Sequence, residues 1–185
     1  LAAELAKRIS TADGLIAAAA ALSGEGRVAQ LADAASTLLG EWCAPDAPPH
    51  YVLRVESLFG GAEPHSSFDK TAGAVVKGEP ARVFVDRVVT PSYVHDVAAA
   101  TVALLDRDAP SGLYHCVNSG AATWFEVAEE IARVVGCEAD LVPVRMGDVP
   151  LKARRPQYAA LSNEKLRRAG IDMPPWQDAL RRYLG

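Results

Sequence analysis

Hydrophobic residues recur at helical spacing through the first 44 residues of the chain. Alanine, the strongest helix former, fills much of this stretch, and a Ser-Gly-Glu-Gly turn at residues 23–26 interrupts it. Prolines at positions 45, 48 and 49 then end the pattern, because proline cannot continue a helix. The pattern predicts a helical segment over residues 1–50 that contains no strand.

From residue 51 onward, short apolar runs rich in β-branched residues alternate with stretches of helical periodicity. The apolar runs predict strands at residues 51–55, 82–85, 113–117 and 141–144. The periodic stretches predict helices over residues 65–78, 96–105, 123–136, 162–170 and 174–183. Strands that alternate with helices in this order predict an α/β chain whose strands pair mainly in parallel.

Two of these helices have recognisable starts. Thr123 and Glu126 are three residues apart at the head of a helical pattern, which is the spacing of a capping box. Asp96 follows His95 at the start of another pattern. Adjacent residues rarely form a catalytic dyad, so we interpret Asp96 as the N-cap of its helix.

The composition is that of an ordinary folded domain, with 50% of the 185 residues hydrophobic and 23% charged. The formal net charge is −4, so no basic excess is present to neutralise a nucleic-acid backbone. The longest apolar stretch, residues 15–22, is far shorter than the roughly 20 residues that a membrane span needs. No basic leader precedes an apolar run, so no signal peptide is expected. We expect neither a nucleic acid nor a membrane as a partner.

The usual sequence signs of a metal, disulfide or dinucleotide site are missing. Cys43, Cys116 and Cys137 are odd in number and widely spaced, which argues against a disulfide framework and favours a cytoplasmic location. The four histidines lack metal-ligand spacing, so no metal is expected. The sequence contains no G-x-G-x-x-G, phosphate-loop or H-E-x-x-H motif.

A basic loop at residues 151–158 carries side chains suited to a phosphorylated ligand. Lys152, Arg154 and Arg155 lie within four positions, and Tyr158 follows them. Guanidinium groups match phosphate oxygens in pairs, and a tyrosine ring can stack on a base. A solvated basic loop explains the same residues, so both interpretations stay open.

A hydroxyl-rich turn, Thr90-Pro91-Ser92-Tyr93, comes just before a predicted helix. Hydroxyl groups and helix N-terminal amides both suit a sugar or a phosphate. A capped turn without a ligand explains the pattern equally well.

Several segments of the chain resemble segments of one known family, and they occur in the same order. Residues 51–60, ending in Leu53-Arg54-Val55-Glu56-Ser57-Leu58-Phe59-Gly60, resemble the segment LRTSWVYG, and residues 67–70 resemble an F-x-K helix start. Residues 90–98 resemble SPTYARDLA, residues 112–126 resemble GIYHL followed by TSWYEFA, and residues 153–166 resemble ARRPxxSxLDTSKL. From about Ser36 to Gly185, the chain therefore resembles the dTDP-4-dehydrorhamnose reductases, which are extended short-chain dehydrogenase/reductases.

This resemblance implies a fold and a function. Members of the family have an N-terminal Rossmann domain for NADPH or NADH and a smaller C-terminal part that holds the nucleotide sugar. They transfer a hydride to the 4-keto group of a dTDP-6-deoxyhexulose. Residues 51–185 would then form a partial Rossmann-like parallel sheet with a sugar-nucleotide-binding subdomain, whose partner is a dTDP-sugar or a related nucleotide sugar. By the resemblance, the substrate is surrounded by Arg54, Glu56, Ser57, Phe68, Lys70, Thr90, Ser92, Tyr93, Arg154 and Arg155.

The chain departs from the family at its chemical centre. Residues 38–42 resemble the K-L-x-G-E segment that follows the catalytic Tyr-x-x-x-Lys pair, which marks residues 33–44 as a remnant of the catalytic helix. In that register Asp33 stands at the tyrosine position and Thr37 at the lysine position. Neither side chain can replace the family's residue, and the glycine fingerprint is also missing. We therefore expect no catalytic residue in this chain, no competence as a reductase by itself, and no NADP or NAD binding by this chain alone.

Several alternatives remain open at the level of sequence. The chain is a fragment or rearranged form of a reductase, or a complete enzyme forms when it joins a separate cofactor-binding chain. It is otherwise a non-catalytic regulatory or scaffold subunit, as in the beta subunit of methionine adenosyltransferase, which resembles the same family. A homodimer or a partner chain is compatible with each alternative.

Overall fold

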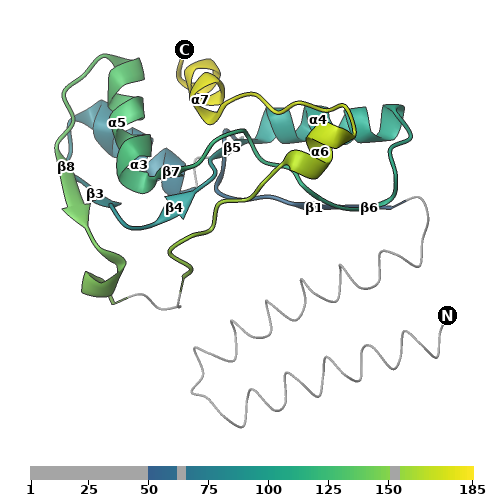
Figure 1. Ribbon diagram of the computed structural model, residues 1–185. Coiled ribbons are helices and arrows are strands. Elements are labelled where there is room, and N and C mark those ends of the chain that lie inside the picture. Colours follow the sequence, from purple (N-terminus) through teal and green to yellow (C-terminus); the bar gives the residue numbers. More distant parts are fainter. Residues whose placement is uncertain (1–49, 62–65, 151–154) are drawn as a thin grey trace, which may run out of the picture. The chain divides into compact units, whose positions relative to one another are not determined.

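The computed structural model describes residues 50–61, 66–150 and 155–185 (Figure 1). The predicted helical segment over 1–50, with the catalytic-helix remnant near 33–44, lies outside the described residues except for His50. The chain divides into two compact units. The described residues of the smaller unit are 50–52, 110–113 and 155, and those of the larger unit are 53–61, 66–109, 114–150 and 156–185.

The predicted alternation of strands and helices is confirmed in the described part of the chain. The helices are α3 (Ser67–Lys77), α4 (Val94–Asp106), α5 (Trp124–Val135), α6 (Glu164–Arg168) and α7 (Trp176–Leu184), with a 3-10 turn η2 (Met146–Asp148). The strands are β1 (Tyr51–Arg54), β2 (Leu58–Phe59), β3 (Ala81–Phe84), β4 (Val88–Val89), β5 (Ser92–Tyr93), β6 (Gly112–His115), β7 (Ala122–Thr123) and β8 (Leu141–Val144). The predicted helices and strands differ from the observed ones by only a few residues at their ends, but the two-residue strands β2, β4, β5 and β7 were not predicted.

The strands pair two by two, and most of the pairs are parallel. β2 pairs with β5 and β3 pairs with β8, both in parallel. β1 pairs with β6 in the same direction, since Gly112 N donates to His50 O at 3.0 Å and Cys116 N donates to Arg54 O at 2.8 Å. β4 and β7 form a short antiparallel pair. The α/β class with mainly parallel pairing is therefore confirmed, and the described strands form four pairs rather than one wide sheet.

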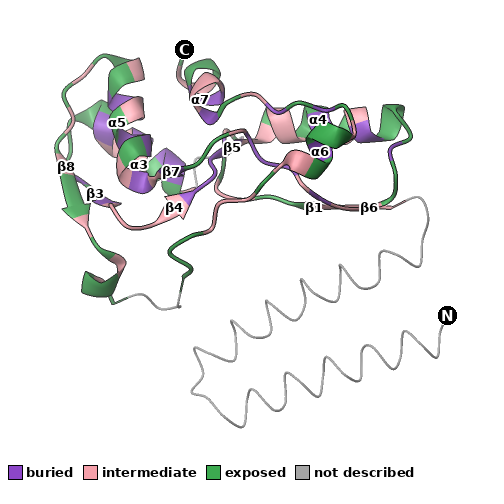
Figure 2. Ribbon diagram, in the orientation of Figure 1, coloured by how far each residue is buried: buried purple, intermediate pink, exposed green. Residues whose placement is uncertain are grey.

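The hydrophobic core of the larger unit lies where α3, α5 and α7 pack on short strands. Phe59 and Phe68 stack with ring centroids 4.1 Å apart, and both rings are buried. α5 contributes Val127 and Ile131, which are fully buried, and Figure 2 shows the buried residues of α3 and α5. Each such side chain stabilises the fold by about 1.5–3 kcal/mol. This core fixes the N-terminal ends of α3 and α5.

Local capping signals determine where these two helices begin. Thr123 Oγ1 accepts from Glu126 N at 3.2 Å, and Glu126 Oε2 accepts from Thr123 N at 2.6 Å, so the predicted capping box is confirmed. Ser66 and Asp69 form a second capping box at α3, with Ser66 Oγ accepting from Asp69 N at 3.0 Å. Gly136 ends α5 in the left-handed conformation that glycine adopts most readily.

The interpretation of Asp96 as an N-cap is wrong. α4 begins at Val94, with Tyr93 as its N-cap, so Asp96 lies inside the first turn. Its carboxylate accepts from Arg182 Nη1 at 2.9 Å and Nη2 at 2.7 Å, and from Asn118 Nδ2 at 2.7 Å. These partners are distant in sequence, and they hold the side chain away from the cap position. Asp96 therefore joins α4 to α7.

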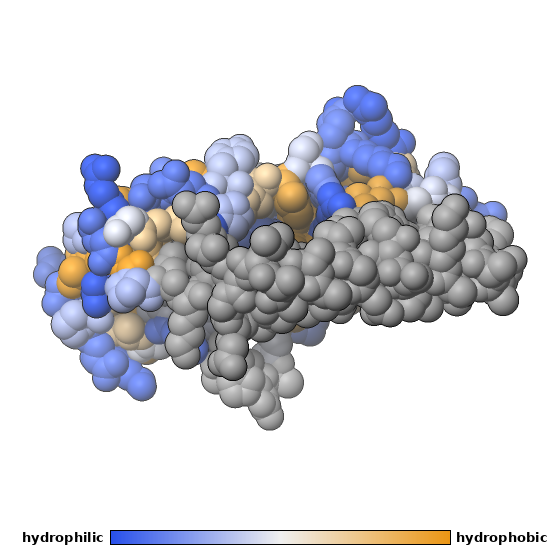
Figure 3. All heavy atoms as spheres, turned by 90° about the horizontal axis from the view of Figure 1, so that it is seen from below, coloured by the Kyte–Doolittle hydropathy of each residue, from blue (hydrophilic) through white to orange (hydrophobic). Residues whose placement is uncertain are grey.

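Some large hydrophobic side chains reach the surface. Val76 on α3 and Val102 and Leu105 on α4 are each more than half exposed. In Figure 3, hydrophobic residues occur in several separate places among hydrophilic ones on one face. No helix in the part of the chain that the structure describes is long and apolar enough to cross a membrane.

Candidate substrate-binding site

Four of the residues expected at the substrate site meet where β1 ends and β5 begins. Glu56 Oε2 accepts from Thr90 N at 2.6 Å, and Glu56 Oε1 accepts from Ser57 Oγ at 2.6 Å. Ser92 N donates to Ser57 O at 3.1 Å. Ser57 has a positive φ of 44°, a conformation that costs free energy for a residue with a side chain. The structure therefore brings Glu56, Ser57, Thr90 and Ser92 together.

Glu56 carries the titratable group of this cluster. Burial raises the pKa of its carboxyl above the usual 4.5, because a buried carboxylate loses hydration. The hydrogen bonds from Ser57 and Thr90 and the positive charge of Arg87 act in the opposite direction.

The end of the basic loop and the residues after it are hydrogen-bonded alongside β4. Val88 N donates to Gln157 O at 2.7 Å, and Ala159 N donates to Val88 O at 2.9 Å. Leu161 N donates to Thr90 Oγ1 at 2.9 Å, which extends this ladder to the hydroxyl turn. We call residues 157–161 the bound segment. These hydrogen bonds therefore hold the bound segment, which starts two residues after Arg155, against β4.

A cationic pocket of about 230 Å³ lies at the first turns of α3 and at β3. Lys70 comes from α3, Arg82 from β3, and Arg87 from the connection to β4. None of the described residues that line the pocket is acidic. Its lining residues are Ser67, Lys70, Thr71, Arg82, Val83, Phe84, Arg87 and Trp124. Three cations from three elements around one cavity can bind an anion with two or more charges.

The first turns of α3 bring two hydroxyl groups to this pocket. Ser67 is the first residue of the helix, and Lys70 and Thr71 follow in its first turns. Asp69 in the same turn forms the capping box with Ser66, so its carboxylate offsets the positive end of the helix. The hydroxyl groups of Ser67 and Thr71 therefore complement the three cations.

Sequence reasoning identified Lys70 but missed Arg82 and Arg87. Arg82 is the exposed residue of a strand whose neighbours Ala81 and Val83 are buried, a pattern that normally marks a solvent-facing side chain. Only the packing of α3 and α5 against β3 turns this position into a pocket wall. An arginine between two apolar residues of one strand was the one available signal, and it is a weak one.

The other expected site residues have different surroundings. Phe68 and Ser92 have no exposed surface, so they support the site from within the core. Tyr93 is half-buried and stacks on Phe59 with ring centroids 5.4 Å apart. Arg54 and Arg155 are exposed, and Arg155 belongs to the smaller unit. Arg154 lies outside the described residues.

The described residues do not fit the phosphates of a dinucleotide cofactor. That role needs a glycine-rich turn directly between a strand and a helix. Gly60 follows β2 with a positive φ of 80°, but the space beside it is filled, because an added Cβ would overlap the Tyr93 ring. This glycine therefore permits packing of an aromatic ring. Within residues 50–61, 66–150 and 155–185, no group of His, Cys, Asp and Glu could hold a metal ion either.

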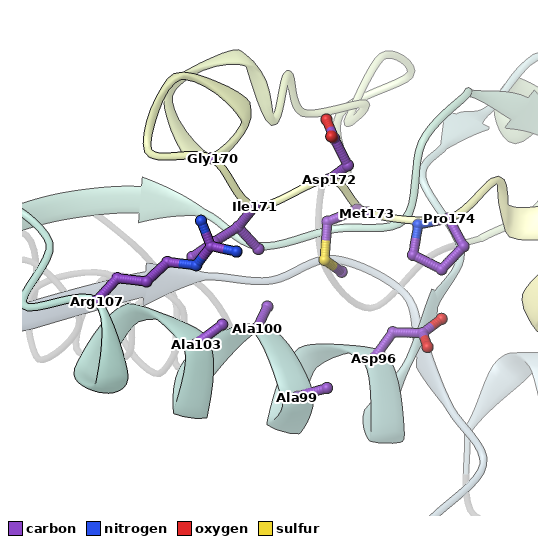
Figure 4. A pocket seen from close by; sticks show the side chains of 10 residues that line it. All are labelled: Asp96, Ala99, Ala100, Ala103, Arg107, Gly170, Ile171, Asp172, Met173 and Pro174. Atoms are coloured by element: carbon purple, nitrogen blue, oxygen red, sulfur yellow. The ribbon is translucent and has the colours of Figure 1, made fainter.

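A second cavity, of about 250 Å³, lies between α4 and residues 170–174 (Figure 4). Three alanines of α4 form its floor, with Asp96 and Arg107 at its opposite ends. Asp96 is already bound by Arg182 and Asn118. One cation facing an acid does not suit a diphosphate, so the cationic pocket is the better candidate.

Comparisons with known proteins agree with this architecture. The family model "RmlD substrate binding domain" matches residues 32–185. The spore coat polysaccharide biosynthesis protein SpsK of Bacillus subtilis is 37% identical over 103 residues, which cover 56% of this chain and 36% of SpsK. A dTDP-4-dehydrorhamnose reductase of Mycolicibacterium smegmatis is 30% identical over 148 residues, which cover 78% of this chain and 45% of the reductase.

Solved structures show the same fold. The dTDP-4-dehydrorhamnose reductase of Bacillus anthracis in complex with NADP matches with a TM-score of 0.75 at 23% identity, over 83% of this chain and 54% of that one. The corresponding enzyme of Clostridium acetobutylicum matches with a TM-score of 0.74 at 23% identity, with the same coverage. The chain thus spans about half the length, or less, of these relatives. Because the family model matches most of its residues, the chain belongs to the family of the RmlD substrate binding domain.

Proposed function

We propose that this chain binds the nucleoside diphosphate of a dTDP-sugar, or of a related nucleotide sugar, in the cationic pocket. It would act as the substrate half of an NAD(P)H-dependent reductase of a 4-keto-6-deoxy sugar nucleotide. The observation that carries the proposal is the convergence of Lys70, Arg82 and Arg87 on one cavity without an acidic neighbour among its described lining residues. Names of relatives that act on dTDP-sugars support the same ligand class.

The volume and the lining of the pocket indicate which part of the ligand it would hold. A volume of about 230 Å³ suits a diphosphate and one ring better than a complete nucleotide sugar. Trp124 and Phe84 offer aromatic surface to a base, and the cations face the phosphates. The sugar would then extend toward Glu56, which follows the end of β1. α/β folds bind ligands at such strand ends.

Reductase activity is proposed only for the full-length arrangement of the family. A nicotinamide cofactor would supply the hydride there, and the described residues of this chain provide no cradle for its phosphates. What this chain supplies is recognition and orientation of the sugar nucleotide.

Calorimetry with dTDP tests the proposal on the 185-residue chain. Lys70→Ala and Arg82→Ala each remove one cation from the pocket, and we expect each to weaken dTDP binding by about 10-fold, the value of one charge-assisted hydrogen bond. Arg168→Ala is the matched control, because Arg168 is an exposed cation on α6 whose partner is Glu164. Equal dTDP affinity in all four proteins would contradict the proposal, and no binding by any of them would favour a scaffold subunit.

The basic loop is tested separately. Replacing Arg154 and Arg155 together by alanine should weaken dTDP binding if these two arginines bind the diphosphate. Unchanged affinity in that double variant, beside a loss in Lys70→Ala, would confine phosphate recognition to the cationic pocket.

A further inference from the structure

The face of α5 opposite Trp124 borders a cavity of about 310 Å³ at the first turn of α7. Most of its charged lining residues are acidic, and it shares no lining residue with the cationic pocket. We call this cavity the acidic pocket, and its polar lining residues are Glu126, Glu129, Glu130, Arg133, Trp176 and Gln177. It is therefore separate from the site proposed for the nucleotide.

Two of its three carboxylates have no cationic partner among the described residues. Arg133 is paired with Glu130, since its Nε donates to Oε2 at 2.7 Å and its Nη2 donates to Oε1 at 2.5 Å. Glu126 Oε2 accepts from Thr123 N and Oγ1 in the capping box, whereas no group in the described part of the chain binds Glu129. Glu126 and Glu129 are three residues apart on one face of α5, where like charges repel each other. A positive group between them would be bound by both.

The indole ring of Trp176 brings a hydrogen-bond donor to the same cavity. The residue is only 4% exposed, and it lines the acidic pocket. A Cβ atom at Gly120 would lie 3.2 Å from Cδ1 and 3.5 Å from Nε1, so this edge of the ring faces the segment whose next residues, Ala121 and Ala122, line the pocket. A buried indole N–H usually has an acceptor, yet none of the described residues accepts from Nε1. An acceptor on a ligand would complete this pairing.

These groups together define the chemistry of the ligand. It must carry a positive charge for Glu126 and Glu129 and an acceptor for the indole N–H. An arginine residue of a polypeptide has both, because its guanidinium group has five donors that can bridge two carboxylates and its backbone carbonyl is an acceptor. Gln177, which also lines the pocket, adds an amide that can pair with a peptide group. A metal ion offers no acceptor, and the described residues contain no group that could hold one.

We propose that the acidic pocket is a docking site for an arginine-bearing segment of a partner polypeptide. The guanidinium group binds Glu126 and Glu129, and a backbone carbonyl of the same segment accepts from Trp176 Nε1. Charge complementarity selects this partner, because the charges without a described partner in the pocket are both negative. The proposal is independent of nucleotide binding, since the two pockets have no lining residue in common.

Nuclear magnetic resonance of the 185-residue chain with 15N-labelled tryptophan tests the proposal, because each of its three indole N–H groups gives one signal. Trp176→Phe identifies the signal of Trp176 by its loss, and Trp42→Phe and Trp124→Phe identify it by elimination if that variant does not fold. The probe is acetyl-Gly-Arg-Gly-amide, with acetyl-Gly-Gln-Gly-amide as its uncharged counterpart. We expect the arginine peptide to shift the Trp176 signal to saturation, with a Kd on the order of 1 mM, and the glutamine peptide to leave it in place.

Two variants remove the charges that the guanidinium group would bind. Glu126→Gln and Glu129→Gln each take away one negative charge, and glutamine at position 126 can still close the capping box. Each should weaken binding of the arginine peptide by about 2–5-fold, the value of an exposed ion pair. Glu138→Gln is the matched control, because Glu138 is an exposed acidic residue that does not line the pocket. It should bind the peptide as the unsubstituted chain does.

The outcomes separate a docking site from weaker explanations. A Trp176 signal that stays in place with the arginine peptide, or moves equally with the glutamine peptide, would overturn the proposal. Equal weakening in all three glutamate variants would show an effect of net charge alone and overturn it too. Spermidine carries positive charge without a carbonyl group, so spermidine binding as tight as that of the arginine peptide would assign the pocket to small cations and exclude peptide docking.

Discussion

The ladder between β4 and the bound segment (residues 157–161) depends on one hydroxyl group. Thr90 is almost fully buried, with 1% of its surface exposed, and its Oγ1 accepts from Leu161 N at 2.9 Å. The neighbouring steps of the ladder use only backbone atoms, on Val88. Thr90→Val keeps the branched shape and removes the acceptor. It therefore isolates one hydrogen bond at the end of the ladder.

The magnitude follows from what Leu161 N loses. A buried donor without an acceptor costs about 1–3 kcal/mol, and Leu161 is only half-buried, so we expect a loss of about 1–2 kcal/mol in unfolding free energy. For a chain of this size, that corresponds to a fall in Tm of roughly 2–8 °C. Thr90→Ser keeps the hydroxyl and loses a buried methyl group, which costs about 1 kcal/mol. Stability therefore falls in both variants.

Ligand affinity separates the two variants. Thr90→Val removes the hydrogen bond between the bound segment and Thr90, a residue of the expected substrate site. We expect dTDP to bind about 3–10-fold more weakly, because a less preorganised site costs more to order on binding. Thr90→Ser should bind dTDP as the unsubstituted chain does. Urea denaturation gives the stabilities and calorimetry gives the affinities. A Thr90→Val protein that unfolds at the original urea concentration, or binds dTDP as tightly as Thr90→Ser, would refute the reasoning.

Three further predictions concern the fold around the site. Gly60→Ala should lower Tm by more than about 4 °C, because its Cβ would overlap the Tyr93 ring and its φ is positive. Gly73→Ala has open space around it and should raise the unfolding free energy by roughly 0.5–1 kcal/mol. Thermal melts measure both. Arg182→Ala breaks the double ion pair with α4 and should cost about 1–3 kcal/mol in urea denaturation, and an unchanged midpoint would show that the pair contributes nothing. Burial raises the pKa of Glu56 in the folded state, so ionisation of this carboxyl destabilises the fold. As the pH rises from about 4.5, the unfolding free energy of Glu56→Gln should therefore increase relative to that of the unsubstituted chain. A difference between the two proteins that stays constant from about pH 4 to 8 would contradict the burial of this carboxyl.

Elements that depend on neighbours in the chain could be predicted from the sequence. Thr123, Glu126 and Gly136 mark both ends of α5, because capping bonds join residues only three positions apart and a left-handed end requires glycine. The strands β3 and β8 are likewise visible as short apolar runs bounded by turn residues. Local hydrogen bonding and periodicity were sufficient for these.

The sequence also determined the family, because segments of characteristic residues follow one another in the family's order along the chain. It placed Lys70 near the start of a helix, Glu56 at the end of an apolar run, and Thr90 in a turn before a helix. Each of these residues is defined by its position in a local element.

Only the tertiary structure decided which distant residues meet. Asp96 is an aspartate at the start of a helical pattern, which is typical of an N-cap. Its carboxylate instead forms an ion pair with Arg182, which is 86 residues away in the sequence. Phe68 belongs to a segment associated with substrate, but its ring is buried against Phe59. Arg82 becomes a wall of the cationic pocket only because α3 and α5 pack on its strand. These ion pairs and packing contacts join elements that are far apart along the chain. The periodicity of the sequence does not show which distant residues meet, so only the fold reveals these contacts.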